Sequence, residues 1–181
     1  MENISRRNFM KGVGAVALAT AATGLLSGCG DNGLIVDANG LNDTANLKGV
    51  KMTVRKLCYA TDSAENYYII PEILIRNETP TSLPVYPTGG SFEVRLNGST
   101  PLNITDESMA RLNNSSDMSK LEKQTLARNQ QDKGWICAKG NVSTQFNYVY
   151  IIYYPNPDDK KTALRCKISS RDAKPVFLGK A

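Results

Sequence analysis

The chain has 181 residues and a mass of 19.8 kDa, with 22 Lys and Arg, 17 Asp and Glu, and no His. This length fits one ordinary domain, and 41% hydrophobic with 22% charged residues excludes both a disordered chain and a membrane protein of several spans. The lack of His excludes a Ser-His-Asp or Cys-His catalytic unit and any His-ligated zinc, copper or haem.

The first 28 residues have the pattern of an export signal. Residues 1–11 carry three basic side chains and one acidic side chain, and residues 12–26 are rich in Ala and Gly with scattered Val and Leu. This apolar segment is shorter and less hydrophobic than a transmembrane helix, which needs about 20 strongly apolar residues. The sequence therefore predicts a signal peptide over residues 1–28.

A motif for the export route lies in Ser5–Lys11, where Arg6 and Arg7 are followed by Phe9. This run resembles the twin-arginine translocation motif, with Met10 at the position that Leu usually occupies. The resemblance implies that the domain folds before export, which often goes with a bound cofactor. Because the chain has neither His nor a Cys-x-x-C pair, we expect no cofactor and instead a domain that folds too fast to be threaded.

A second motif ends the signal, where Leu26, Ser27 and Gly28 precede Cys29. These four residues resemble a bacterial lipobox, in which the Cys thiol is diacylated and the chain is cut before it. The resemblance implies an extracytoplasmic lipoprotein anchored to the bacterial cell membrane through Cys29, since two acyl chains give durable anchoring. The alternative is a plain secretory signal with a chance Cys.

The region after Cys29 is predicted to be a flexible tether over residues 29–48, because it is rich in Gly, Asn and Asp. The run Leu34–Val36 leaves open a short edge strand instead. The mature part has a small positive net charge and no basic run, so nucleic acid is not an expected partner.

From residue 49 the chain shows the period of β-strands. Apolar and polar residues alternate over residues 50–55, which predicts a half-buried strand. A second strand is predicted over residues 67–76, where Pro71 favours a bulge or an edge position. A third strand, over residues 92–96, ends at the turn signal Asn97-Gly98.

The segment 104–128 keeps no clean strand period. A short helix is predicted near residues 106–112, with Thr105 or Asp106 as its N-cap. Strands resume at residues 134–139, 145–154 and 162–169. The whole pattern predicts an all-β, antiparallel β-sandwich over residues 49–172 with a helix or loop insertion, followed by a C-terminal tail at residues 173–181.

Three runs point to one kind of sandwich. They are the strand Ile73–Asn77, which closes on Asn, the stretch Leu126–Ile136, which ends in Gly-Trp-Ile, and the strand Tyr148–Tyr154. Their order and spacing resemble the immunoglobulin-like domains of unknown function carried by many bacterial surface lipoproteins. The resemblance implies an immunoglobulin-like fold and a surface location, with no chemistry to carry over.

The cysteines after Cys29 are Cys58, Cys137 and Cys166, so at most one internal disulfide can form. Cys58 and Cys166 are each in phase with the apolar residues of their strands, which favours a Cys58–Cys166 bridge in the core. The alternative is three reduced, buried thiols. Cys137 has no His to activate it as a nucleophile.

The tyrosines near the C-terminus are the best binding signal in the sequence. Tyr148, Tyr150 and Tyr154 fall on one face of the predicted strand, and Tyr153 falls on the other. Tyrosine rings can stack on sugars or anchor a protein partner, so the first three form a candidate binding face. The alternative is that this face packs under a loop.

These features predict a lipid-anchored, non-catalytic binding or interaction module at the bacterial cell surface. Its expected partners are the membrane, through the lipid anchor, and an envelope protein or cell-wall polymer. No metal site is expected, because the acidic residues are scattered and no calcium-loop spacing occurs. The alternative is an accessory subunit or chaperone of an exported enzyme complex, which would use the sheet edge near Pro71.

Overall fold

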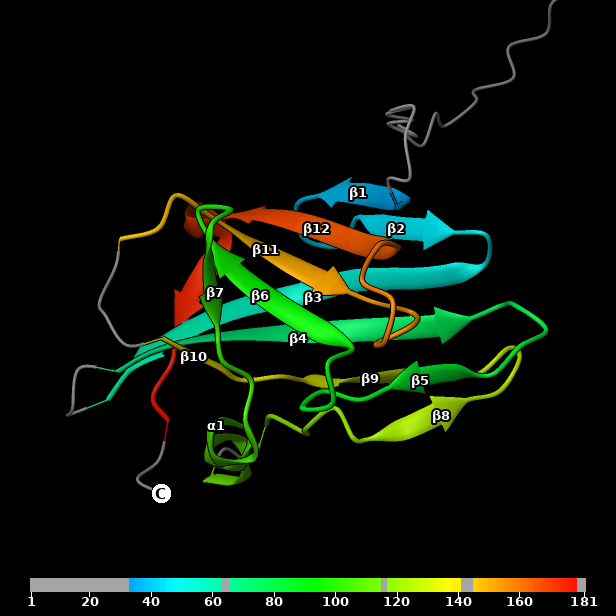
Figure 1. Cartoon of the computed structure of the whole chain (residues 1–181). Helices are drawn as coiled ribbons and strands as arrows, with labels where there is room; N and C mark the ends of the chain where they lie inside the picture. Colours follow the sequence, from blue (N-terminus) through cyan, green and yellow to red (C-terminus); the bar gives the residue numbers. More distant parts are fainter. Residues whose placement is uncertain (1–32, 63–65, 115–116, 141–144, 179–181) are drawn as a thin grey trace, which may run out of the picture.

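Two packed β-sheets make up the fold of this chain. The computed structural model describes residues 33–62, 66–114, 117–140 and 145–178, which form a β-sandwich (Figure 1). The first sheet has five strands, in the order β1 (Ile35–Asn39), β12 (Ala163–Ser169), β11 (Tyr148–Tyr153), β6 (Phe92–Leu96) and β7 (Thr100–Leu102).

The second sheet has six strands built around a long hairpin. Its main order is β10 (Ala138–Gly140), β4 (Tyr67–Asn77), β3 (Val50–Thr61) and β13 (Ala173–Pro175), while β2 (Thr44–Leu47) pairs with β3 and β9 (Gln131–Trp135) pairs with β4. A separate two-stranded pair joins β5 (Leu83–Val85) to β8 (Gln124–Leu126).

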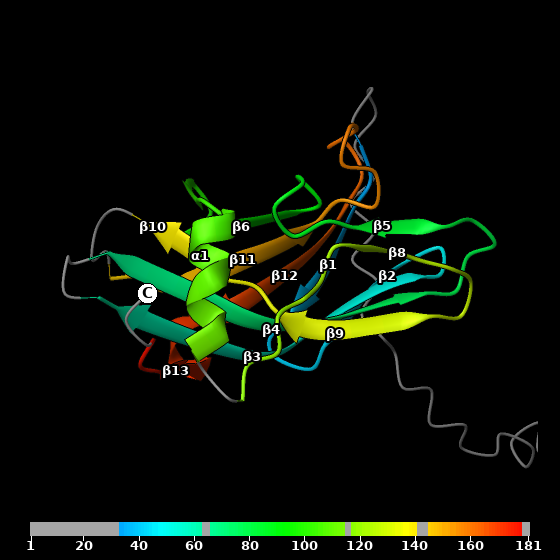
Figure 2. The same cartoon turned by 90° about the horizontal axis from the view of Figure 1, so that it is seen from below.

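One hydrophobic core lies between the two layers, which Figure 2 shows from the side. Because successive side chains of a strand point to opposite faces, each alternating strand gives one face to this core. The fully buried contributions include Val94, Val149, Ile151, Leu164 and Ile168 from the first sheet and Met52, Val54, Ile73 and Ile75 from the second. Each such aliphatic side chain adds about 1.5–3 kcal/mol of burial free energy. The predicted all-β sandwich is confirmed.

Both chain regions that flank the predicted domain also pair with it, so two predictions were wrong. Residues 29–48 were expected to form a tether, but its described part contains β1, parallel to β12, and β2, antiparallel to β3. The C-terminal tail contains β13, parallel to β3. The composition misled because Ala38 and Ala45 are small yet buried, and Gly40 and Asn42 supply a turn with positive φ. The alternative of an edge strand at Leu34–Val36 agrees with β1.

Pro71 lies in the central strand β4, beside the gap between β9 and β10, which pair with the same side of β4 one after the other. β4 pairs with β3 on one side and with β9 and β10 on the other, so the edge position proposed for Pro71 was wrong. The Pro71 carbonyl accepts the N–H of Ile136 at 3.1 Å, between the end of β9 and the start of β10. Because N and O of one strand residue point the same way, the missing N–H of Pro71 falls at this break.

The bulge expected near Pro71 lies on the partner strand. Val54 pairs with Ile73 and Lys56 with Glu72, so Arg55 is an extra residue in β3. The extra residue reverses the inward and outward alternation of β3. Cys58 therefore lies opposite Ile70, on the same outward face as the Lys56–Glu72 pair, rather than with Met52 and Val54.

This reversal explains why the predicted Cys58–Cys166 disulfide was wrong. Cys166 pairs with Ile151 and belongs to the core face of the first sheet. Cys58 is on the outer side of the second sheet, and Cys58, Cys137 and Cys166 are all free and buried thiols. The alternative of three reduced, buried thiols agrees with the structure.

The predicted helix is α1 (Asp106–Ala110), which continues into the 3₁₀ turn η1 (Arg111–Asn114). Thr105 is its N-cap, because its hydroxyl accepts the N–H of Ser108. In return, the backbone N–H of Thr105 donates to the Ser108 hydroxyl. Figure 2 shows α1 lying across the open side of the sandwich. Among the described residues, no helix is long and apolar enough to span a membrane.

Candidate functional site

The outward side of the five-stranded sheet carries tyrosines among charged side chains. β11 turns Val149, Ile151 and Tyr153 into the core, so the other three tyrosines near it share the outer side. Residues of β6, β12 and β1 surround them. We define the tyrosine face as Tyr148, Tyr150, Tyr154, Asp37, Glu93, Arg95, Arg165 and Lys167.

Tyr148 and Tyr150 are half-exposed and pack edge to face, with ring centroids 5.3 Å apart. The ammonium of Lys167 lies 4.3 Å from the centroid of the Tyr148 ring, and the guanidinium of Arg165 lies 4.7 Å from that of Tyr150. Both contacts are diagonal ones across the β11–β12 pair, since Tyr148 lies opposite Ser169 and Tyr150 lies opposite Lys167. Each ring is therefore held in place by a cation, which is worth about 0.5–1 kcal/mol at an exposed position.

Two of the three cations of the face, Arg165 and Arg95, are held in fixed positions by carboxylates. Arg165 donates to both oxygens of Asp37, from Nε at 2.6 Å and from Nη2 at 2.9 Å, and these hydrogen bonds raise the pKa of Arg165. Arg95 donates from Nε to Glu93 within the same strand. Three cations and two carboxylates leave the face with a net positive charge.

Tyr154 belongs to the face but is not free to bind. It is only 6% exposed and packs on Ile152 and Ala163. Its hydroxyl donates to Glu93 Oε2 at 2.8 Å, and burial, together with this hydrogen bond, raises the pKa of Tyr154 to about 12. Of the three predicted binding tyrosines, Tyr148 and Tyr150 therefore present a surface, and Tyr154 supports them from below.

The hairpin turn at Asn97-Gly98 completes one end of the face. Both residues have positive φ, +49° and +82°, as a tight hairpin turn requires. The Tyr148 hydroxyl donates to the Asn97 carbonyl at 2.9 Å. A Cβ at Gly98 would lie 3.0 Å from the Tyr148 hydroxyl and 3.2 Å from the Tyr150 ring. Sequence reasoning found this turn but did not connect it to the tyrosines, because that contact joins residues 50 or more positions apart.

A polar hollow of about 370 Å³ lies at the same end of the sheet. It is lined by Asn39, Gly40, Asn147, Tyr148, Lys167, Ser169 and Asp172. Its size is near the lower limit for a small-molecule site, and its amide, hydroxyl, ammonium and carboxylate groups suit a polar ligand. The tyrosine face and this hollow share Tyr148 and Lys167, so they form one candidate site.

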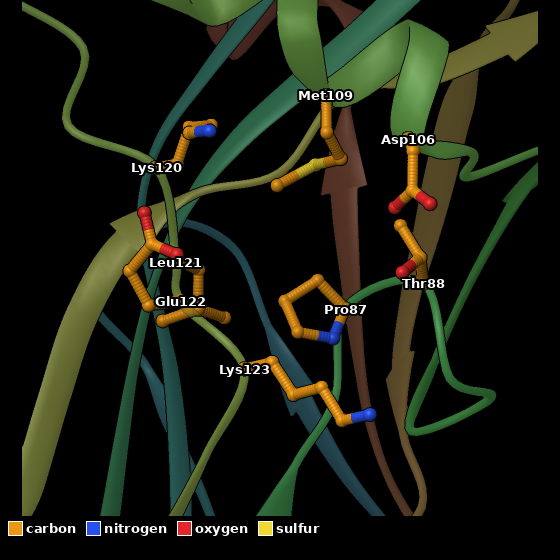
Figure 3. Close-up of a pocket in the computed structure, with 8 residues that line it drawn as sticks. All are labelled: Pro87, Thr88, Asp106, Met109, Lys120, Leu121, Glu122 and Lys123. Atoms are coloured by element: carbon orange, nitrogen blue, oxygen red, sulfur yellow. The ribbon is translucent and has the colours of Figure 1, made fainter.

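A second hollow, beside α1, is too small to compete. It has a volume of about 120 Å³, room for about four water molecules, and Figure 3 shows Met109 and Pro87 reaching into it. Charged side chains surround it: Asp106, Lys120, Glu122 and Lys123. None of the predicted site residues lines this hollow, and we assign it no role.

The buried thiols are poor nucleophiles. Burial raises the pKa of Cys137 and of Cys166 to about 12 each, so both stay protonated at neutral pH. Burial also raises the pKa of Cys58. Within the described part of the chain, no three His, Cys, Asp or Glu side chains gather into a group that could hold a metal ion.

Comparison with known sequences identifies the N-terminal signal. Residues 3–23 match the signal sequence of the twin-arginine translocation (TAT) pathway, a range that includes Arg6, Arg7 and Phe9. The chain therefore carries a twin-arginine export signal. Leu26, Ser27, Gly28 and Cys29 lie beyond that match, and all of these signal and lipobox residues lie outside the described residues. No curated protein matches the chain.

Comparison with solved structures finds similar bacterial proteins. The proposed lipoprotein YcdA from Bacillus subtilis is 16% identical over 71% of this chain, with a TM-score of 0.54, and the match spans only 39% of YcdA. YjhA from Bacillus subtilis is 14% identical, with 73% of this chain and 100% of YjhA covered and a TM-score of 0.48. A proposed lipoprotein from Staphylococcus aureus is 7% identical, with 76% and 97% covered and a TM-score of 0.46. The match to YcdA shows a shared fold.

Proposed function

We propose that this protein is a lipid-anchored, non-catalytic binding module of the cell envelope, whose tyrosine face binds an anionic cell-wall polymer. The observation that carries the proposal is the pair of half-exposed rings, Tyr148 and Tyr150, each held by a cation on a sheet face with net positive charge. Aromatic rings stack on sugar units, and Lys167, whose charge neither carboxylate of the face balances, attracts phosphate or carboxylate groups along the polymer.

The anchoring part of the proposal rests on the N-terminus. A twin-arginine signal directs the chain out of the cytoplasm, and Leu26-Ser27-Gly28-Cys29 has the order of a lipobox. Acylation of Cys29 would hold the binding face close to the membrane, where cell-wall polymers are made and attached. Similarity in fold to a proposed lipoprotein is consistent with this anchor.

The alternative as an accessory subunit or chaperone has less support. It relied on an open sheet edge near Pro71, but β4 is paired along both sides. A strand of a partner protein could therefore not add to the sheet at β4, because no free edge exists there. The tyrosine face remains the surface with the strongest support.

Binding is tested with purified protein and purified teichoic acid, a phosphate-rich wall polymer, with neutral dextran as the comparison. The double variant Tyr148→Ala, Lys167→Ala removes one stacked pair, and we expect a loss of about ten-fold in affinity for teichoic acid, typical of an important contact residue. The matched control is Tyr86→Ala, Lys123→Ala, since Lys123 lies 5.3 Å above the Tyr86 ring outside the tyrosine face. Equal losses in both variants, or none in the first, would contradict the assignment.

Anchoring is tested in cells. The Cys29→Ala variant is expected to carry no acyl chains and to keep its signal peptide, and Arg6→Lys with Arg7→Lys is expected to remain in the cytoplasm. Intact mass of the wild-type protein reads the acyl chains directly. A wild-type mass without acyl chains would contradict lipid attachment at Cys29.

A further inference from the structure

The end of the sandwich at which β1 begins must lie close to the proposed lipid anchor. Gly33 is the first described residue, four positions after Cys29. Since an extended chain spans at most about 3.6 Å per residue, the Cα atoms of Cys29 and Gly33 are no more than about 15 Å apart. A tether over residues 29–48 would have allowed roughly 70 Å. The domain is thus held at the membrane rather than spaced away from it.

This end of the molecule also exposes apolar side chains. Leu34, which directly precedes β1, is 41% exposed, and Ile35, the first residue of β1, is 47% exposed. Both lie next to the turn between β11 and β12. The N–H of Ala163 donates to the Leu34 carbonyl at 3.0 Å, and a Cβ at Gly33 would collide with the backbone of Lys161.

The adjoining turn adds two exposed lysines: Lys160, whose ammonium lies 5.3 Å from the centroid of the Tyr154 ring, and Lys161. Asp158 and Asp159 in the same turn balance this charge, and the Asp159 carboxylate accepts the backbone N–H of Lys161 at 3.1 Å. The turn is therefore nearly neutral overall. We define the anchor end as Leu34, Ile35, Lys160 and Lys161. Figure 1 shows the β11–β12 turn and the start of β1 at the same end of the sandwich.

We infer that the anchor end rests on the lipid headgroups, with Leu34 and Ile35 at the membrane interface and the two lysines beside lipid phosphates. The inference rests on the proposed acylation of Cys29. Interfacial contact follows from the short link, because acyl chains in the bilayer bring this end of the domain to the surface. Aliphatic side chains then gain burial free energy in the interface, and long Lys side chains can extend their amines toward phosphate.

This contact sets the direction of the binding site. Ile35 pairs with Ala163 at the anchor end, and Asn39 pairs with Lys167 four residues further along β1. At about 3.3 Å per residue, Lys167 lies roughly 13 Å farther from the membrane than Ala163 if the strand stands upright. The exposed rings Tyr148 and Tyr150, with the polar hollow, would then lie toward the end of the sheet that is farther from the bilayer.

The test places an environment-sensitive fluorophore at Leu34→Cys or at Asp172→Cys, the second being on the hollow at the far end. The three native thiols are buried, and Cys29 is occupied by its lipid. The acylated protein is reconstituted in vesicles of phosphatidylglycerol and phosphatidylcholine that carry nitroxide-labelled lipid. We expect strong quenching at position 34 and little at position 172. Quenching at Lys160→Cys should fall when Leu34 and Ile35 are both changed to Asp.

Each contrary result has a defined meaning. Equal, weak quenching at positions 34 and 172 would overturn the inference. Shielding of the label at position 34 without vesicles would overturn it in favour of contact between two copies of the chain. Intact mass is measured first and reports acylation separately. If Cys29 carries no lipid, it is coupled to a maleimide lipid and the same quenching is measured. Acylation of Cys29 and membrane contact of the anchor end can therefore fail independently.

Discussion

Asn77 illustrates how one buried polar side chain joins distant segments. It ends β4 and is fully buried, yet its amide donates to the carbonyls of Thr81 at 2.7 Å and Leu126 at 2.9 Å. Its side-chain oxygen accepts the N–H of Thr79 at 2.9 Å. The side chain thus connects β4, the following loop and β8, and no apolar residue of the same size could satisfy these groups.

We expect Asn77→Ala to lower the free energy of unfolding by about 1–3 kcal/mol, because it removes the amide donor to the buried Leu126 carbonyl and one of two side-chain donors to the Thr81 carbonyl. Asn77→Asp should be nearly as harmful, since a carboxylate cannot donate to either carbonyl. Urea unfolding followed by fluorescence of the Trp side chain measures both. A loss below about 0.5 kcal/mol, typical of surface substitutions, would show that the network carries little stability.

Glu93 links stability to pH. Burial alone would raise the pKa of Glu93, but hydrogen bonds from Arg95 and Tyr154 outweigh it and lower the pKa below its ordinary value of 4.5. The carboxylate therefore stabilises the folded state above pH 4.5, and this contribution is lost as pH falls through the folded pKa. We expect Glu93→Gln to be less stable at pH 7 and to lose less stability between pH 5 and about 3.

The measurement is the free energy of unfolding in urea at several pH values. The control is Glu107→Gln, an exposed carboxylate on α1. If wild type and Glu93→Gln lose stability in parallel on acidification, Glu93 does not have a lowered pKa in the folded state.

In the turn between β6 and β7, the cost of a positive φ can be measured separately from the cost of crowding the tyrosines. Gly98 and Gly90 have similar positive φ values, +82° and +87°, but a Cβ at Gly98 meets the two tyrosines and one at Gly90 meets only the Pro157 Cβ, at an ordinary 3.9 Å. We expect Gly90→Ala to cost about 1 kcal/mol from backbone strain alone, and Gly98→Ala to cost more.

Thermal unfolding measures both substitutions, and teichoic acid binding should weaken only in Gly98→Ala, because only that Cβ displaces Tyr148 and Tyr150. Equal destabilisation and unchanged binding in the two variants would show that the turn does not position the rings.

The β3 bulge is an element that sequence period could not reveal. Apolar residues alternate correctly up to Val54, and the pattern gives no sign that Arg55 is an extra residue. A single inserted position exchanges the two faces of everything after it. For this reason the strand was predicted correctly, while the direction of Cys58, and with it the disulfide, was not.

The whole molecule folds without covalent cross-links in its described part. A domain with free thiols can fold in a reducing cytoplasm, as export of a folded protein by the twin-arginine pathway requires. We expect no labelling of Cys58, Cys137 or Cys166 by iodoacetamide in the folded protein at pH 8, since burial shields all three and raises their pKa values.

In denaturant without a reducing agent, peptide mapping should find all three cysteines labelled, and prior reduction should change nothing. Labelling of Cys137 alone in the unreduced sample would revive the Cys58–Cys166 bridge. Rapid labelling of a folded thiol would show that the buried position is opened by local unfolding.

Local patterns in the chain were sufficient for the export signal, the sandwich, the capped helix and the tyrosine stripe, because each depends on residues a few positions apart. Contacts over long separations decided the rest. Arg165 reaches Asp37 across 128 positions, which makes β1 a strand rather than a tether and holds a cation over Tyr150. Likewise, burial of Tyr154 and exposure of Tyr148 and Tyr150 depend on what neighbouring strands place beside them, which no period along one strand contains.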